Sequence, residues 1–316
     1  MAVPAPDCAP NPASNTVAAD LTLAFTRERS RLWGLAYRMT GCAADADDIV
    51  QDTFAKALAS GLSLPVVQWQ GWLTQVTAHA AIDVLRRRRR RGYSGSWLPS
   101  PIETADAENT DPAQRYSQLE SISFAFLMAL EALSPRQRAV LLLREVFDHS
   151  AASAGDLLGM SEGNVRVTHM RARRILDAAQ QQPAAAATTA EMQRALAELL
   201  RGLMTQDTAA VEALLARDAR AVTDAGGEFN ALARPMLGAA RVARLLLRVS
   251  ARRSPGSHFV PCTLNGEPAL AIVYGKAERR QAPRAVMRCQ LDASGRIREL
   301  HVVLATRKLS HVAFER

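Results

Sequence analysis

The sequence predicts a multidomain fold class, in which two all-α domains precede an α+β domain. Three observations support this prediction. Apolar residues recur at three- and four-residue spacing in two stretches before residue 181, as in helices that bury one face. Segments rich in proline, glycine and alanine separate these stretches from each other and from the rest of the chain. The last third of the chain begins with helical patterns and ends with alternating, strand-like ones.

The linkers divide the chain into six expected segments. At 316 residues, the chain is long enough for each domain to bury a core of its own. We expect a disordered tail at 1–18, a first helical domain at 19–91, a linker at 92–122, a second helical domain at 123–180, a short linker at 181–190 and an α+β domain at 191–316.

The net charge of +8 is distributed unevenly. Residues 1–183 contain 19 basic and 19 acidic side chains, whereas the remainder contains 20 and 12, so the α+β domain supplies the whole excess. In the helical part, charges of opposite sign are segregated instead. Acids cluster at 45–52 and six arginines run from Arg86 to Arg91, so different faces can address different partners.

Composition also indicates where in the cell the protein resides and whether it holds a metal or a cofactor. No apolar stretch approaches the roughly 20 residues of a membrane span, and the N-terminus lacks the basic start and apolar core of a signal peptide. We therefore expect a cytoplasmic protein with no membrane partner. The cysteines are Cys8, Cys42, Cys262 and Cys289. They lie far apart with no histidine at zinc-finger spacing, so we expect neither a metal site nor a cofactor.

The first helical domain reads as three short helices around one core. The apolar positions at helical spacing are Leu32, Leu35, Ala36 and Met39 before a break at Gly41-Cys42, and Val50, Phe54 and Leu58 after it. The second of these helices carries an acidic set made of Asp47, Asp48, Gln51 and Asp52 beside Phe54. An apolar anchor ringed by charge has the composition of a protein-docking surface. The alternative is a solvated helix with Phe54 in the core.

The third helix of this domain carries a candidate nucleic-acid face. The residues that fall near one side at three- and four-residue steps are His79, Asp83, Arg86 and Arg87. The arginine run at 86–91 would follow a phosphate backbone and make binding depend steeply on salt. Trp69 and Trp72 could stack on bases, although we favour core packing for Trp72.

The second helical domain contains a helix-turn-helix pattern between Ala132 and Leu176. Leu158-Gly159-Met160-Ser161-Glu162 supplies an apolar helix end, a glycine suited to a left-handed stop and a serine that can cap the next helix. In that next helix, the narrow apolar face consists of Val165, Ala172 and Leu176, and the arginines are Arg166, Arg171, Arg173 and Arg174. Arginine contacts both phosphates and guanine edges. The alternative is a helical hairpin with a solvated basic face.

Three stretches resemble a known family. ALSPRQRAVLLLREVFDHSAASAGDLLGMSEGNVRVTHMRARRIL resembles region 4 of bacterial sigma-70-type factors, which reads the minus-35 promoter element. DADDIVQDTFAKAL at 45–58 resembles their region 2.2, and GWLTQVTAHAAIDVLRRRRRR at 71–91 resembles their regions 2.3 to 2.4. In this order and with no domain between them, the motifs are similar to those of the compact extracytoplasmic-function (ECF) sigma factors.

This resemblance implies a role for each candidate face. Core RNA polymerase would bind Asp47, Asp48, Gln51, Asp52 and Phe54. Minus-10 promoter DNA, with one base flipped out, would bind His79, Asp83, Arg86 and Arg87. Minus-35 DNA would bind Ser161, Asn164, Arg166, Arg171, Arg173 and Arg174. His79 stands where the family often has asparagine, and Ala151 and Ser153 replace a bulky aromatic residue and an acid, so we expect a different promoter preference. Gly155 is expected to weaken its helix by roughly 1 kcal/mol.

The α+β domain resembles the SnoaL-like fold, a curled antiparallel sheet with helices over a conical pocket, which is fused to one group of ECF sigma factors. Trp97-Leu98-Pro99-Ser100-Pro101, Asp224-Ala225-Gly226-Gly227-Glu228 and Ala305-Thr306-Arg307-Lys308-Leu309 resemble three motifs of that group. There the extension regulates the factor by contacting the linker and region 2. The residues with this implied interdomain role are Trp97, Leu98, Pro99, Asp224, Gly226, Gly227, Lys308 and Leu309.

The pattern of this domain supports the resemblance and suggests a further contact. Asn265-Gly266 between two apolar runs predicts a hairpin, and alternating sets at 285–291 and 300–304 predict strands. A basic stripe at helical spacing consists of Arg241, Arg244, Arg248 and Arg252. We expect this stripe, or residues near it, to meet the acidic cluster at 45–52 or the linker acids Glu103, Asp106 and Glu108. The alternative is a solvated helix, because exposed ion pairs contribute little.

We interpret the chain as an ECF-type sigma factor and not an enzyme, with core RNA polymerase and promoter DNA as its partners. Ligand sensing by the last domain is an alternative for that domain alone. Catalysis there, by His258 or His301 with Asp224 as a weaker candidate, is disfavoured because no nucleophile-and-base spacing is visible. The alternative for the whole chain is a helix-turn-helix regulator that binds duplex DNA without polymerase and senses a small molecule.

Overall fold

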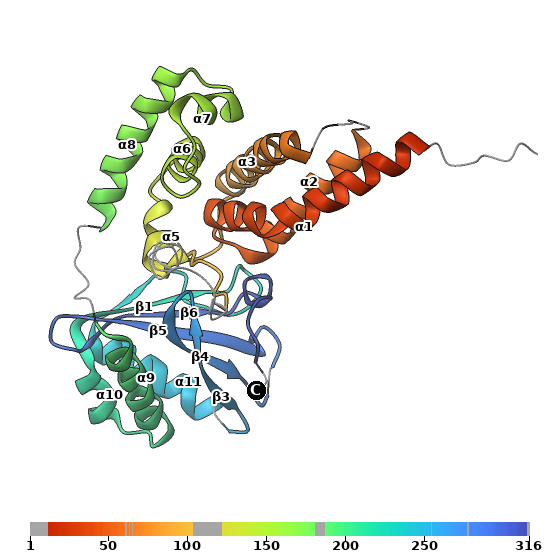
Figure 1. The fold of residues 1–316 in the computed structure, drawn as a ribbon. Coiled ribbons are helices and arrows are strands. Elements are labelled where there is room, and N and C mark those ends of the chain that lie inside the picture. The colour runs from red at the N-terminus through yellow and green to blue at the C-terminus, as the bar shows by residue number, and fades with distance from the viewer. Residues whose placement is uncertain are drawn as a thin grey trace, which may run out of the picture.

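The structure is a computed structural model that describes residues 12–60, 62, 64, 66–103, 122–180, 187–253, 255–276 and 278–314. Two groups of helices lie on one side of a six-stranded sheet, and three further helices cover its other side (Figure 1). None of the helices in the described part of the chain has the length and apolarity needed to span a bilayer.

The first helical domain contains α1 (Pro12–Thr40), α2 (Ala43–Ala59) and α3 (Val66–Arg91). Helix α1 begins within the segment for which we expected a disordered tail. The break at Gly41 is real, because this glycine adopts a φ of 64° and Cys42 follows in extended geometry at the N-cap of α2. Of the three apolar positions predicted for α2, Val50 and Phe54 are buried, but the prediction for Leu58 was wrong because its side chain is 68% exposed.

The second helical domain contains α5 (Phe124–Leu130), α6 (Pro135–Glu145), α7 (Ala151–Leu158) and α8 (Glu162–Gln180). The helix-turn-helix forms as predicted. Gly159 ends α7 in left-handed geometry, and the Ser161 hydroxyl accepts a hydrogen bond from the Asn164 amide at the start of α8. Packing explains the glycine at position 155, since the Cβ of any other residue there would lie 2.5 Å from the carbonyl oxygen of Met160.

The two helical domains share one hydrophobic cluster, to which α1, α2, α3, α6, α7 and α8 all contribute. Arg138 of α6 crosses between them with a side chain that is 2% exposed. It donates to the carbonyl oxygens of Met39 in α1 and Leu130 in α5, and it forms an ion pair with Glu131 at 2.7 Å. Arg88 of α3 pairs with the same carboxylate at 2.6 Å. These contacts hold the two helical domains side by side.

The C-terminal domain begins with α9 (Thr189–Met204) and α10 (Thr208–Leu214). The elements that follow are β1 (Leu215–Asp224), β2 (Met236–Leu237), α11 (Ala239–Arg253), β3 (His258–Leu264), β4 (Glu267–Val273), β5 (Arg284–Leu291), β6 (Ile297–Val303) and the 3-10 turn η1 (Thr306–Leu309). The strand order is β2-β1-β6-β5-β4-β3. Strands β1 and β6 pair in parallel, which corrects the expectation of an antiparallel sheet throughout.

Both faces of this sheet are buried, and they have different partners. The face that includes Leu270, Met287 and Leu300 packs against α9 and α11. The opposite face includes Ala271, Val286 and Val303, and it is covered by Leu98 of the linker and Phe124 of α5. The C-terminal domain therefore shares a core with the segment that joins the helical domains, in addition to its own core.

Candidate polymerase- and DNA-binding surfaces

The acidic surface of α2 is defined here as the docking face and consists of Asp47, Asp48, Gln51 and Asp52. Asp48, Gln51 and Asp52 are exposed, and Asp47 is partly exposed. Asp47 is held from both sides, because it accepts a hydrogen bond from Trp33 Nε1 at 2.8 Å and its other oxygen lies 2.7 Å from His311 Nε2. The docking face is thus a surface of carboxylates, one of which is already bound by other side chains of the same chain.

Two aromatic side chains proposed for binding lie in the core instead. Phe54 is 6% exposed and packs edge-on against Phe25, with ring centroids 4.6 Å apart, so it is no surface anchor in this structure. Trp69 is fully buried, which rules out base stacking in this arrangement. Trp72 is partly buried and meets Trp69 edge-on at 5.6 Å, in agreement with the packing that we favoured.

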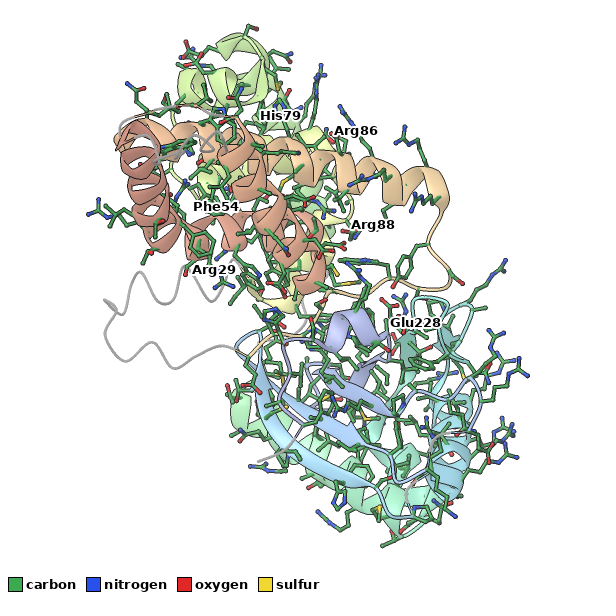
Figure 2. All side chains as sticks on the ribbon, turned by 90° about the vertical axis from the view of Figure 1, so that its right-hand side faces the viewer. Arg29, Phe54, His79, Arg86, Arg88 and Glu228 are labelled. Atoms are coloured by element: carbon green, nitrogen blue, oxygen red, sulfur yellow. The ribbon has the colours of Figure 1, made fainter. Side chains whose placement is uncertain are left out.

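The candidate minus-10 face of α3 is open to solvent. His79, Asp83, Arg86 and Arg87 are all exposed, and Arg86 pairs with Asp83 at 3.2 Å (Figure 2 labels His79 and Arg86). The arginine run does not act as one unit, however. Arg88 is turned inward to Glu131 and to the carbonyl of Thr40, and Arg89 donates to the carbonyl of Leu133. Two of the six arginines therefore bind the second helical domain in this structure.

The candidate minus-35 face lies on α8. Val165, Ala172 and Leu176 are buried as the helical period predicts. The candidate contacts Ser161, Asn164, Arg166, Arg171, Arg173 and Arg174 are all exposed. Arg166 pairs with Glu162 at 2.5 Å, and Arg173 pairs with Glu145 at 2.9 Å. Arg171 and Arg174 form no ion pair among the described residues, which leaves their guanidinium groups available to phosphate or base edges.

A buried carboxylate joins the linker to the C-terminal domain. Asp224, at the end of β1, is fully buried and accepts hydrogen bonds from Tyr93 Oη at 2.6 Å, the Leu98 amide at 2.7 Å and Lys308 Nζ at 2.6 Å. Lys308, which is 4% exposed, also donates to the carbonyl of Leu98. We call this group of four residues the Asp224 junction. Burial lowers the pKa of Lys308 and raises that of Tyr93, while Asp224 opposes the shift of Lys308.

The remaining motif residues surround this junction. Trp97 lies against Arg88 and Lys308, each 4.5 Å from its ring, and a Cβ on Gly41 would collide with it at 2.5 Å. Pro99 and Leu309 are buried. The glycines of the Asp224 motif adopt φ of 58° at Gly226 and 80° at Gly227, and the Gly226 amide donates to Asp224. All eight residues with an implied interdomain role thus gather at one place in the fold.

A second polar contact was not predicted. Tyr37 of α1 is fully buried, donates to the carbonyl of Ser100 at 2.7 Å and accepts from Asn265 Nδ2 at 2.7 Å. The Asn265 side chain also accepts from the Ile102 amide. Burial raises the pKa of Tyr37. Asn265 with φ 53° and Gly266 with φ 76° form the predicted hairpin turn, but no pattern in the sequence indicated that this turn would reach α1.

The docking face is contacted by the segment after β6 and not by the basic stripe. Arg307 lies 3.2 Å from Asp45 and 2.7 Å from Asp48, and His311 reaches Asp47. Helix α11, which carries the stripe, packs beside β1, β2, α9 and α10 instead, so our expectation that the stripe meets the acidic cluster was wrong. Of the linker acids, Glu103 accepts from the Ala313 amide, and Asp106 and Glu108 lie outside the described residues. The sequence signal available for this contact was the motif at 305–309, in which Arg307 directly precedes Lys308 and Leu309.

The two histidines considered as catalytic bases lie in different surroundings. His258 is exposed on β3. His301 is 2% exposed, stacks on Phe124 with ring centroids 5.2 Å apart and lies 3.0 Å from Glu299. Burial lowers the pKa of His301. Asp224, the third candidate, already accepts the hydrogen bonds of the Asp224 junction. The described residues contain no cluster of His, Cys, Asp and Glu that could hold a metal ion.

The buried imidazole predicts a pH dependence. Burial lowers the pKa of His301 in the folded protein, whereas in the unfolded chain the imidazole gains a proton near its ordinary pKa of 6.5. Stability is therefore present above pH 6.5 and is lost as the pH falls below it, by up to about 1.4 kcal/mol per pH unit. Urea unfolding between pH 7 and 5 should show this slope for the natural chain and a reduced slope for His301→Gln. Equal slopes for the two proteins would contradict the assignment.

Comparisons with known proteins identify the family of both helical domains. The family model for sigma-70 region 2 matches residues 24–91, and that for sigma-70 region 4 matches residues 123–176. The ECF RNA polymerase sigma factor SigJ of Mycobacterium tuberculosis is 31% identical over 256 residues, which cover 80% of this chain and 78% of the relative. SigG of the same species, also an ECF RNA polymerase sigma factor, is 30% identical over 273 residues, which cover 77% and 70%.

The solved structures extend the similarity to the C-terminal domain. The crystal structure of Mycobacterium tuberculosis SigJ matches with a TM-score of 0.66 and 26% identity, and the match covers 93% of this chain and all of the other. The fold of two helical sigma domains followed by an α+β, SnoaL-like domain is therefore as predicted. Both helical regions and two relatives matched over most of their length show that the chain belongs to the extracytoplasmic-function (ECF) RNA polymerase sigma factors.

Proposed function

We propose that the chain directs core RNA polymerase to promoters, with α2 facing the polymerase, α3 facing the minus-10 element and α8 facing the minus-35 element. The observation that carries this proposal is the presence of one acidic and two arginine-bearing exposed helix faces on a chain of the ECF family. Bond formation belongs to the polymerase, and the named relatives are sigma factors, not enzymes. The chain acts where the polymerase is, in the cytoplasm.

We infer that the arrangement in the structure is a closed state. The names of the two promoter elements place them about 25 base pairs apart, which is roughly 85 Å at 3.4 Å per base pair. In the structure, α3 contacts α6 and α7, and both helical domains share one cluster. Helix α8, with 19 residues, is only about 28 Å long. The two helical domains must therefore separate before both promoter elements can be contacted at once.

The C-terminal domain is proposed to stabilise this closed state and to modulate activity. Three observations support this role: the Asp224 junction fixes the linker, Phe124 at the start of the second helical domain is buried against the sheet, and Arg307 and His311 occupy the docking face. The same carboxylates are the candidate contacts for the polymerase. Release of the C-terminal domain would therefore free the docking face and the linker together.

Competition for the docking face can be tested with Arg307→Ala combined with His311→Ala. Since exposed ion pairs contribute about 0 to 1 kcal/mol each, we expect affinity for core polymerase to rise by about fivefold. Fluorescence titration of labelled full-length chain with core enzyme measures this affinity. The matched control is Arg279→Ala with His258→Ala, which removes the same residue types from exposed positions away from α2. Unchanged or weaker binding by the test variant would contradict competition.

The minus-35 role of α8 can be tested with Arg171→Ala. Loss of a phosphate or base contact costs about 1–3 kcal/mol, so we expect promoter binding by the holoenzyme to weaken about 5- to 150-fold. The salt dependence of binding should also fall by about one contact if the lost partner is a phosphate. Filter binding at several salt concentrations measures both quantities. Arg201→Ala, which changes an exposed arginine of α9, should leave binding unchanged, and an equal loss in both variants would count against α8.

A further inference from the structure

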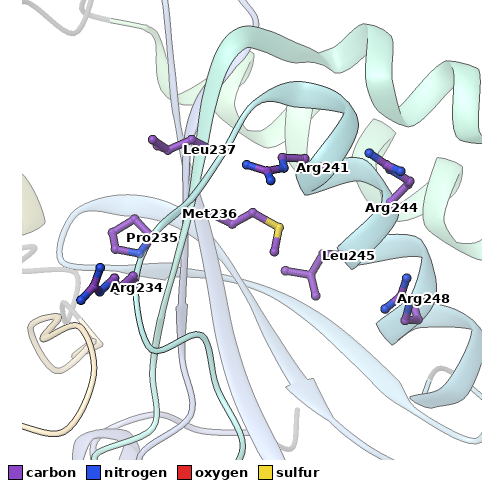
Figure 3. Close-up of a pocket in the computed structure, with 8 residues that line it drawn as sticks. All are labelled: Arg234, Pro235, Met236, Leu237, Arg241, Arg244, Leu245 and Arg248. Atoms are coloured by element: carbon purple, nitrogen blue, oxygen red, sulfur yellow. The ribbon is translucent and has the colours of Figure 1, made fainter.

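A groove of about 460 Å³ lies on the C-terminal domain between the β2 segment and α11, where three arginines of the basic stripe line it. Its lining consists of Arg234, Pro235, Met236 and Leu237 from the β2 segment, and Arg241, Arg244, Leu245 and Arg248 from α11. Met236 and Leu245 lie between the arginines, with Arg234 on one side and the three arginines of α11 on the other (Figure 3). We call this site the arginine groove.

The charges of the arginine groove are not compensated within the described part of the chain. All four arginines are exposed, and none forms an ion pair with a carboxylate there. Among the described residues, the one hydrogen bond from these guanidinium groups runs from Arg244 Nε to the carbonyl of Ala240 in its own helix. Like charges three and four residues apart on a helix repel each other. A bound anion would remove this repulsion, and the planar guanidinium group suits two-point contact with phosphate.

The apolar lining narrows the class of anion. Met236 and Leu245 are only partly buried, and Leu237 is 55% exposed beside them. A nucleic-acid backbone offers nothing to cover such a surface, whereas an apolar chain does. The volume lies in the range of about 300–1,000 Å³ that is usual for small-molecule sites. We propose that the arginine groove binds a small amphiphilic anion, with an apolar chain on Met236 and Leu245 and a phosphate monoester between the arginines.

The position of the groove connects it to the Asp224 junction. Residues 224–237 form one segment, with the junction at its start and the groove at its end. Strand β2 pairs with β1 at Ala221↔Met236, three residues before Asp224, and the Leu232 amide donates to Thr223 Oγ1 at 2.7 Å. A ligand that moves β2 therefore acts on the strand that carries Asp224. This coupling rests on the proposed closed state, whereas binding itself does not.

Binding is tested by calorimetric titration of the full-length chain with monooctyl phosphate, without polymerase. Inorganic phosphate and 1-octanol each provide only one part of this ligand, the phosphate group or the apolar chain. Each should bind at least tenfold more weakly than monooctyl phosphate. Arg244→Glu with Arg248→Glu should weaken the binding of monooctyl phosphate at least tenfold. Arg279→Glu with Arg296→Glu makes the same charge change at exposed positions outside the groove and should leave binding unchanged. Vesicles containing phosphatidic acid, tested alongside, distinguish a lipid headgroup from a free metabolite.

Several results would overturn the proposal: no binding of monooctyl phosphate, equal binding by both double variants, or groove-dependent binding of random duplex DNA alone. If the charge-reversed variant fails to fold, Arg241→Gln with Arg248→Gln replaces it and carries the same expectation. Because the titration contains no polymerase, its failure is distinguishable from failure of the proposed function. An effect of the bound ligand on polymerase affinity tests the coupling separately.

Discussion

Replacement of Asp224 by asparagine is expected to open the interdomain junction. The ammonium group of Lys308 is 4% exposed and has this carboxylate as its charged partner at 2.6 Å. Breaking a buried ion pair on one side costs about 3–5 kcal/mol, because the remaining charge stays buried without compensation. The Leu98 amide donates to Asp224, so its hydrogen exchange reports the opening. We expect protection of that amide to fall at least a hundredfold.

A second variant separates the charge effect from general damage. Adding Lys308→Met to Asp224→Asn removes the unpaired ammonium group and replaces it with an apolar chain of similar length. A buried pair replaced on both sides is often close to neutral, so protection should recover at least tenfold relative to the single variant. The single variant should also bind core polymerase more tightly, since release of the linker accompanies release of the docking face. Protection within threefold of the natural chain would contradict this account of the junction.

Replacement of Arg138 by methionine is expected to loosen the two helical domains from each other. This side chain is 2% exposed, donates to the carbonyls of Met39 and Leu130 and pairs with Glu131. Burial lowers the pKa of Arg138, while Glu131 opposes that shift. The loss of the charge leaves two carbonyl oxygens without their donor, at a cost of about 3–5 kcal/mol.

The effect of Arg138→Met can be measured as a loss of stability and as a separation of the two helical domains. We expect a lower urea midpoint and a larger radius of gyration by small-angle scattering, since Arg138 bridges α6 to α1. Arg136→Met is the matched control, because Arg136 is exposed two residues earlier on the same helix. Its midpoint and radius should equal those of the natural chain. If Arg138→Met lowered the midpoint while the radius stayed the same, the residue would stabilise its own domain without holding the closed state.

Short-range patterns in the sequence predicted much of the fold. The helix-turn-helix follows from local chemistry, because Gly159 can adopt left-handed geometry and Ser161 can cap α8. The burial of Val165 and Ala172 follows from a period of 3.6 residues. Strand alternation likewise placed the residues of β5 that face the helices. Each of these features depends only on residues that are close to one another in the sequence.

Features that depend on distant partners could not be predicted in this way. Leu58 and Phe54 share a helix face, yet one is 68% exposed and the other 6%, because only the packing of α1 and α3 decides which position is covered. The parallel pairing of β1 with β6 joins the two ends of a domain. Arg307 meets Asp48 across 259 positions of sequence. Composition and periodicity contain no information on such contacts, whereas the motif resemblance indicated the region where they occur.

Run-off transcription with purified core RNA polymerase tests the central claim most directly. Core enzyme is combined with the full-length chain on promoter templates chosen by sequencing transcripts made from genomic DNA. The account predicts initiation at defined start sites that is absent with core enzyme alone and lost when Asp48 and Asp52 of the docking face are both replaced by lysine. If core enzyme neither bound the chain nor gained specific initiation from it or from its Asp224→Asn variant, the account would be contradicted.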